Sequence, residues 1–75
     1  MDYHSIITLE HGKRGGKACI RGLRITVYDV LESLSNGTTI DSLLEDFPEL
    51  TQQDILACFA YAADREHRIT TVHAA

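Results

Sequence analysis

The sequence lacks the features that define several common classes of protein. Its two cysteines, Cys19 and Cys58, are too few for a disulfide framework and do not have the spacing of a metal motif. No apolar run reaches the roughly 18 residues that a membrane span requires. The first residues also lack the charged and then apolar pattern of a signal peptide. We therefore expect a cytoplasmic protein whose thiols are reduced.

Further absences argue against an enzyme. A chain of 75 residues forms one small domain and is too short for a Rossmann fold or a TIM barrel. None of the four histidines lies three or four residues from another histidine or a cysteine, so the sequence presents no metal site. The glycine-rich segment 11–17 fails the phosphate-binding P-loop pattern, because His11 replaces its first glycine and Ala18 its hydroxyl residue. We expect no catalytic residue, no cofactor and no small-molecule substrate.

Positive charge is scarce after residue 26. Residues 1–26 carry five lysines and arginines against two acids, a net charge of +3. Residues 27–75 carry two arginines against nine acids, a net charge of −7. The cations of the first segment are our candidates for contacts with DNA phosphates: Lys13, Arg14, Lys17, Arg21 and Arg24. They are equally suited to the acidic body of a second copy.

The first 26 residues have the composition of an extended arm. Residues 5–9 are rich in β-branched side chains and predict a short strand. After a polar glycine-rich loop, residues 18–21 and 23–26 flank Gly22 and predict two very short strands or an extended hairpin. Such a ribbon is not stable alone in water, so it must lie on helices or pair with another chain.

Three apolar residues of the first strand indicate a partner. Ile6, Ile7 and Leu9 are expected to lie outside the trihelical core and belong to a strand that needs an edge. A second copy of the chain would bury these side chains and pair their backbone groups. We therefore expect a homodimer through the N-terminal strand, with or without exchange of that strand between copies.

Residues after Thr26 have the periodicity of helices. Apolar positions three and four apart predict a helix from Thr26 to Gly37, a second from Thr39 to Pro48, and a third from Thr51 to residue 66. The turn between the second and third helices has helix-turn-helix length. The expected fold is mainly α, with an extended β arm and basic loop at 1–26, a trihelical helix-turn-helix core at 27–68, and a tail at 69–75.

The helical pattern also predicts which side chains are buried. One side of the third helix gathers Ile55, Leu56 and Phe59, and the opposite side carries Asp54, Ala57 and Tyr61 among others. The expected core consists of Ile20, Ile25, Val27, Val30, Leu31, Leu34, Ile40, Leu43, Leu44, Phe47, Leu50, Ile55, Leu56, Phe59 and Ala63.

The exposed side of the third helix has two interpretations. Gln52, Gln53 and Ala57 lie where a recognition helix would contact base edges, since glutamine pairs with adenine and alanine meets the thymine methyl. Acids on the same helix oppose DNA, and a helix that reads DNA usually carries more lysine and arginine. The alternatives are a solvated face and a protein-binding face that includes Tyr61 and Arg65.

One stretch of the chain resembles a bacterial family, domain of unknown function 433. The resemblance covers residues 16–66, about two-thirds of the chain. It departs from the family pattern at Ala18 and Leu23, where the family often has proline and threonine. The matching residues are Gly16, Lys17, Cys19, Ile20, Arg21, Gly22, Arg24, Ile25, Asp46, Phe47, Pro48, Leu50, Thr51, Tyr61, Ala62 and Ala63.

This resemblance implies a function. The family is similar to VapB-type antitoxins with a homeodomain-like trihelical core, which implies a type II toxin-antitoxin system, a PIN-type ribonuclease as the partner toxin, and binding to the protein's own promoter DNA. The leading hypothesis is therefore a small non-enzymatic antitoxin. The alternative is a dimeric protein–protein interaction domain that does not bind DNA.

Overall fold

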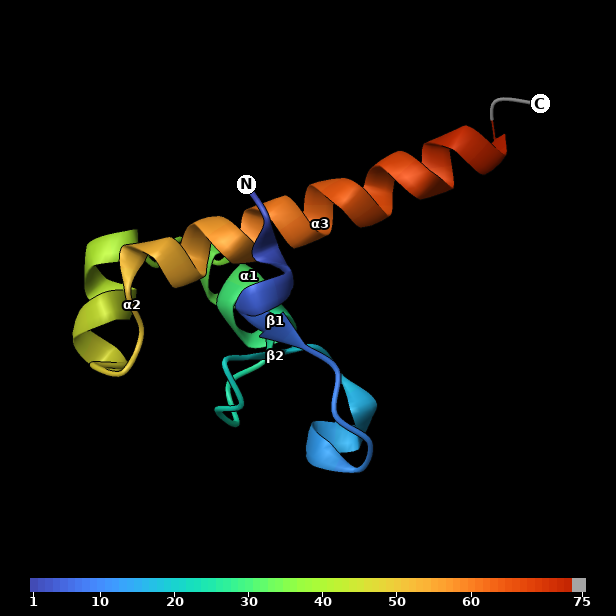
Figure 1. Ribbon diagram of the computed structural model, residues 1–75. Helices are drawn as coiled ribbons and strands as arrows, with labels where there is room; N and C mark the ends of the chain where they lie inside the picture. The colour runs from blue at the N-terminus through green and yellow to red at the C-terminus, as the bar shows by residue number, and fades with distance from the viewer. Residues whose placement is uncertain (74–75) are drawn as a thin grey trace.

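The computed structural model describes residues 1–73, with side-chain environments for residues 1–67. Two short strands, β1 (Ile7–Thr8) and β2 (Cys19–Ile20), precede the helices α1 (Val27–Ser35), α2 (Ile40–Asp46) and α3 (Gln52–His73). In Figure 1, α3 forms the long axis, α2 lies beside its start, and α1 and the strands lie along one side of it. The fold is mainly α with a small antiparallel β arm, as the sequence predicts.

Each helix begins at the threonine that the sequence indicates. The Thr26 hydroxyl accepts the Asp29 N–H at 2.9 Å, and the Asp29 carboxylate accepts the Thr26 N–H at 3.1 Å. Thr51 and Asp54 form the same capping box at the start of α3. The Thr39 hydroxyl caps α2. These side chains satisfy backbone N–H groups that the first helical turn leaves without a partner.

The helix ends agree with the sequence in two cases and differ in the third. Gly37 has a φ of 98°, the left-handed conformation that commonly ends a helix, and α2 ends just before Pro48. However, α3 continues to His73, so the tail expected at 69–75 is wrong as far as residue 73. Its last two residues lie outside the described ones. Residues 69–72 are all β-branched, but a helix that has already formed extends through them at small cost.

The β arm already has its edge partners inside the chain. β1 pairs with β2 in antiparallel fashion, with Ile7 opposite Ile20. The strand expected at 18–21 is present as β2, and the segment expected at 23–26 folds back on it through a single antiparallel bridge between Cys19 and Thr26. Ile7 is 7% exposed and belongs to the core, so the expectation that it lies outside the core is wrong.

The core lies between this ribbon and the inner faces of the three helices. Ile20, Ile55, Val30 and Leu43 are its largest fully buried apolar side chains. Most of the expected core residues are buried or pack against it. Three are not: Leu56, Phe59 and Ala63 are exposed.

The error concerns which side of α3 faces inward. Asp54, Ala57 and Cys58 are buried, whereas Leu56 is 44% and Phe59 41% exposed. The small side chains at 57 and 58 permit close packing against the rest of the chain, and an ion pair holds Asp54 inside. Counting large apolar residues therefore predicted the wrong face.

Candidate functional site

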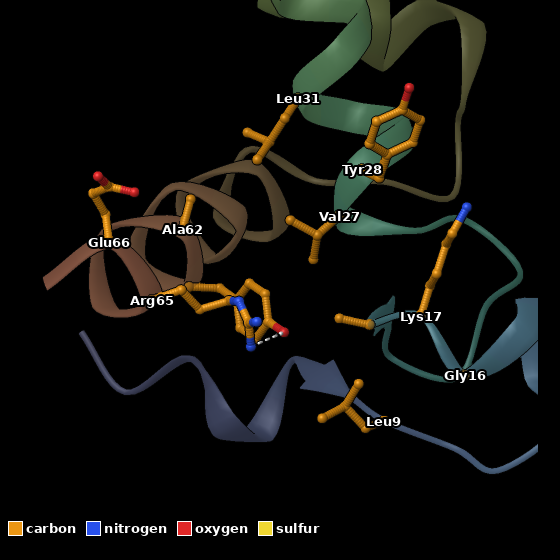
Figure 2. A pocket seen from close by; sticks show the side chains of 11 residues that line it. Leu9, Gly16, Lys17, Val27, Tyr28, Leu31, Ala62, Arg65 and Glu66 are labelled. Atoms are coloured by element: carbon orange, nitrogen blue, oxygen red, sulfur yellow. Dashed lines mark hydrogen bonds between the residues drawn. The ribbon is translucent and has the colours of Figure 1, made fainter. Parts of the chain in front are cut away.

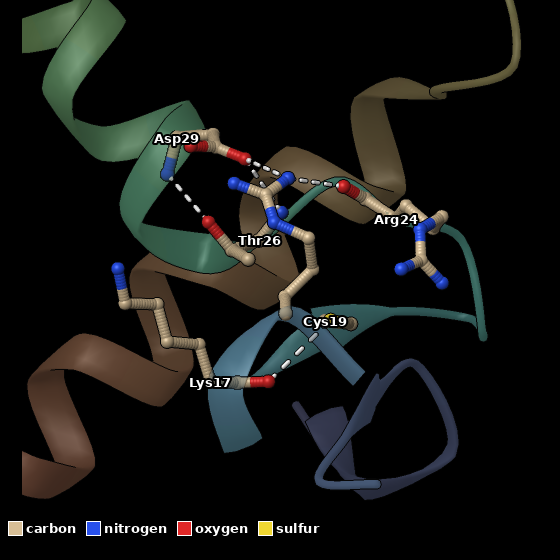
Figure 3. A network of polar contacts seen from close by, with 6 residues as sticks. Lys17, Cys19, Arg24, Thr26 and Asp29 are labelled. Carbon is tan, nitrogen blue, oxygen red and sulfur yellow. Dashed lines mark hydrogen bonds and ion pairs between the residues drawn. The ribbon is translucent and has the colours of Figure 1, made fainter. Parts of the chain in front are cut away.

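Two of the candidate DNA-contacting cations fasten the glycine-rich loop to the rest of the chain. Lys13 Nζ donates to the Gly22 carbonyl at 2.6 Å and forms an ion pair with Glu10 at 3.2 Å. The Arg14 guanidinium donates to the Arg24 carbonyl at 2.6 Å and to Asp29 at 3.2 Å (Figure 3). Burial alone would raise the pKa of Asp29, but hydrogen bonds with Thr26 and the charge of Arg14 hold it below its usual value.

A third cation, Arg21, joins the arm to the start of α3. Its Nε and one terminal nitrogen each donate to the Asp54 carboxylate at 2.9 Å, and the same terminal nitrogen donates to the Glu49 carbonyl at 2.7 Å. Asp54 is 2% exposed. Burial favours its neutral form, but the bonds from Arg21 and Thr51 outweigh this and lower the pKa of Asp54. Arg21 adopts a φ of 46° to make this contact.

These contacts change the interpretation of the DNA candidates. The guanidinium and ammonium groups of Lys13, Arg14 and Arg21 are bound within the chain, whereas Lys17 and Arg24 are exposed. Ala57 is fully buried, so its assignment as a base-contacting residue is wrong. The sequence predicts an inner side of α3 that is rotated toward Leu56 and Phe59, so Ile55 is buried as predicted but Ala57 is assigned to the wrong face. Gln52 and Gln53 are exposed at the start of α3.

A shallow groove of about 630 Å³ lies between the arm, α1 and α3 (Figure 2). Ala18, Val27, Leu31 and Ala62 contribute apolar surface to it. Leu9 stands at its edge on the segment after β1 and is 67% exposed. The groove therefore presents apolar surface to solvent where three parts of the chain meet.

Two cations on opposite sides of the groove lie against tyrosine rings. Lys17 Nζ is 5.3 Å from the centre of the Tyr28 ring, and Arg65 Cζ is 5.6 Å from the centre of the Tyr61 ring. The Tyr28 hydroxyl donates to the Glu32 carboxylate, and this hydrogen bond raises the pKa of Tyr28. Cation–π contacts restrict both cationic side chains while leaving their charges accessible.

A second hollow of about 190 Å³ adjoins the first and shares Leu9, Tyr61 and Arg65 with it. Its wall includes the Tyr3 ring, which packs edge-on against Tyr61 with centroids 5.5 Å apart. The Tyr3 hydroxyl donates to Asp64 on α3. The N-terminal segment is thereby fixed against α3 and completes this side of the groove.

The groove unites three of the residues that the sequence suggested for protein binding. Leu9, Tyr61 and Arg65 line it, whereas Ile7 is buried and Ile6 is half-buried against the core. Sequence reasoning assigned Lys17 to DNA and did not assign Tyr28 any role. Tyr28 could have been identified as a candidate because it is a tyrosine on the polar side of α1.

Neither thiol is presented to solvent. Cys19 and Cys58 are both fully buried, and burial, with a smaller contribution from Asp54, raises the pKa of Cys58 to about 12. Reactivity requires an accessible thiolate. We therefore expect both cysteines of the folded protein to resist Ellman's reagent and to react together in denaturant. Rapid labelling of either one in the folded protein would contradict this packing.

The described residues contain no group of three histidine, cysteine or acidic side chains arranged to hold a metal ion. Within the same part of the chain, no helix combines the length and the hydrophobicity needed to cross a membrane. The features left for recognition are the groove, the exposed cations Lys17 and Arg24, and the outer face of α3.

Comparison with known proteins agrees with the sequence resemblance. Residues 7–62 match the family described as "Protein of unknown function (DUF433)". The chain belongs to DUF433. That match covers both strands, α1, α2 and α3 as far as Ala62, so it includes Tyr61 of the groove but not Arg65.

Two similar proteins extend the comparison. A crystal structure of a DUF433 member from Anabaena variabilis ATCC 29413 is similar over 91% of this chain and 67% of its own, with a TM-score of 0.80 and 29% identity. The uncharacterized protein y4eO of Sinorhizobium fredii (strain NBRC 101917 / NGR234) is 35% identical over 57 residues, which are 76% of this chain. The match spans about a quarter (26%) of y4eO.

Proposed function

We propose that this chain is a non-enzymatic protein-binding module of the antitoxin type, which neutralises a PIN-type ribonuclease by holding a segment of it in the groove. The observation that carries this proposal is the groove itself, with exposed apolar surface between Lys17 and Arg65. Exposed apolar surface with a polar rim is typical of protein-binding sites. The antitoxin role extends the resemblance to VapB-type antitoxins.

The chemistry of the groove defines the segment that it binds. Leu31 and Ala62, which are half-buried, favour apolar side chains at the centre of the partner segment. Lys17 and Arg65 favour carboxylates on either side of them. Because both cations are already restricted by tyrosine rings, binding loses less side-chain entropy. The preferred partner segment is therefore apolar in the middle and acidic at its flanks.

Promoter DNA is the second candidate, and the exposure of Lys17 and Arg24 supports it. Lys17 and Arg24 of the arm favour weak, salt-dependent contacts with phosphates. The exposed start of α3 offers Gln52 and Gln53, but the Arg21 guanidinium beside them is bound to Asp54, and Ala57 is buried, so base reading has less support. Protein binding is the function that the geometry supports best.

The test is rescue of cells that express a PIN-type ribonuclease from the same host. We expect the wild-type chain to restore growth and to bind the purified ribonuclease. Reversing both groove charges, Lys17→Glu with Arg65→Glu, should weaken binding because the new carboxylates repel acidic flanks of the partner segment. We expect Kd to rise by about tenfold or more, a loss of at least ~1.4 kcal/mol in binding free energy. The matched control is Arg24→Glu, which changes an exposed cation that does not line the groove.

The variants separate the two candidate functions. Loss of binding in the Lys17/Arg65 variant but not in Arg24→Glu supports the groove. An equal loss of DNA affinity for Lys17→Glu and Arg24→Glu, with no effect of Arg65→Glu, supports phosphate contacts by the arm. If the wild-type chain neither rescues growth nor binds the ribonuclease, the antitoxin proposal is wrong.

A further inference from the structure

Helix α3 is apolar on two sides, and only one of them faces the core. The inner side contributes Ile55 and Cys58, which are fully buried. The outer side exposes Leu56 (44%) and Phe59 (41%), although a surface helix usually presents charged residues there. Exposed apolar surface of this kind indicates a partner.

We propose that a second copy of this chain covers the outer side of α3, with the two helices antiparallel. The relevant side chains are Leu56, Phe59, Ala60 and Ala63, which fall within an arc of about 100° at 3.6 residues per turn. A two-fold axis between Phe59 and Ala60 places Leu56 of one copy opposite Ala63 of the other. It also places Phe59 opposite Ala60. Each large side chain therefore meets a small one, which permits close helix packing.

Charge on this side of α3 favours the same arrangement. The two-fold axis places Gln53 of one copy opposite Glu66 of the other, and Gln52 opposite His67, so no like charges face each other. A parallel arrangement would instead bring Glu66 against Glu66 and Phe59 against Phe59. Like charges and paired bulky rings both disfavour it. The stripe is thus complementary to itself only in the antiparallel direction.

The position of α3 in the fold leaves this side accessible. Figure 1 shows α1 and the β strands gathered along the opposite side of α3, whose C-terminal part projects beyond them. One edge of β1 pairs with β2 and Ile7 is buried, so the arm offers a second copy less apolar surface than the sequence predicts, and we place the interface on α3 instead. The groove uses Tyr61 and Arg65, which are not in the stripe, and meets the interface at Glu66.

Sedimentation of the full-length chain tests the interface. We expect a dimer at micromolar concentration, and monomers for Leu56→Glu and for Ala63→Glu. Ala63 is exposed in the middle of a helix, so its substitution by glutamate should leave the fold intact, as circular dichroism would verify. Leu9→Glu is the matched control, because Leu9 is exposed and lies away from α3's outer side. A monomeric wild type, or a dimeric Ala63→Glu variant, would overturn the proposal.

Cysteine cross-linking tests the direction of packing. Both native thiols are fully buried, so introduced cysteines should dominate oxidation. A mixture of Leu56→Cys and Ala63→Cys chains should form a mixed disulfide more readily than either variant forms a disulfide with itself. Preferential self-linking of each variant would indicate parallel packing and refute the antiparallel arrangement. Neither experiment depends on the ribonuclease, so failure here and failure of the groove proposal are distinguishable.

Discussion

Replacing Asp54 by asparagine is expected to lower the free energy of unfolding by about 2–3 kcal/mol, because it removes the buried carboxylate that binds Arg21, whose side chain is 41% exposed. The carboxylate accepts two hydrogen bonds from Arg21 and one from the Thr51 backbone. An asparagine has one acceptor oxygen, and its NH₂ group would face donors that it cannot satisfy. In a domain of this size, such a loss lowers Tm by roughly 10–20 °C.

Thermal and urea unfolding followed by circular dichroism measure this effect. Asp46→Asn is the matched control, because Asp46 is an exposed acid at the end of α2. It should change Tm little, as most exposed substitutions do. A Tm for Asp54→Asn as high as that of the control would mean that the Arg21–Asp54 pair does not stabilise the fold.

Replacing Arg21 by glutamine is expected to destabilise the protein strongly at neutral pH and much less in acid. In the folded chain the pKa of Asp54 lies below its unfolded value of about 3.9, so its contribution is present above that pH and is lost as pH falls through the folded pKa. Once Asp54 is protonated, Arg21 has no charge to pair with. The stability difference between wild type and variant should therefore shrink below about pH 4.

Urea unfolding at neutral pH and near pH 3 checks this convergence. Glutamine is chosen because the strain of a φ of 46° at position 21 is similar for glutamine and arginine. Arg24→Gln is the control, and its effect should be small and independent of pH. If the difference for Arg21→Gln is the same at both pH values, Arg21 acts through the Glu49 carbonyl alone.

The local features of the fold could be predicted from the sequence. Thr26, Thr39 and Thr51 start the three helices, and Gly37 and Pro48 end two of them, because capping and helix termination depend on residues close together in the chain. The mainly α fold class followed from these signals and from the apolar periodicity.

The inner side of α3 could not be predicted in the same way. Leu56 and Phe59 outweigh Ala57 and Cys58 in any count of apolar surface, yet the smaller pair is buried. That choice depends on a contact between Asp54 and Arg21, 33 residues apart, which helical periodicity does not contain. From the sequence alone, an acid in the first helical turn is equally consistent with an exposed capping residue and with a buried one.

Only part of the candidate site could be predicted, because the rest also depends on contacts between residues far apart in the chain. Leu9, Tyr61 and Arg65 were identified from their residue types, but their meeting at one groove depends on how the arm packs on α3. Net charge indicated a basic arm without indicating that Lys13 and Arg14 are bound to backbone carbonyls nearby. Composition describes how many charges a segment carries, and tertiary contacts determine which remain available.

The double role of Asp54 also has a consequence for the folding pathway. The same carboxylate caps α3 and binds Arg21, so the local capping box is reinforced when the β2 turn packs against it. Formation of this helix start and long-range chain closure therefore stabilise each other, which favours a single cooperative transition over stepwise assembly. We expect a peptide that contains only α3 to be weakly helical at its start, and mutations at either residue to slow refolding in the intact chain.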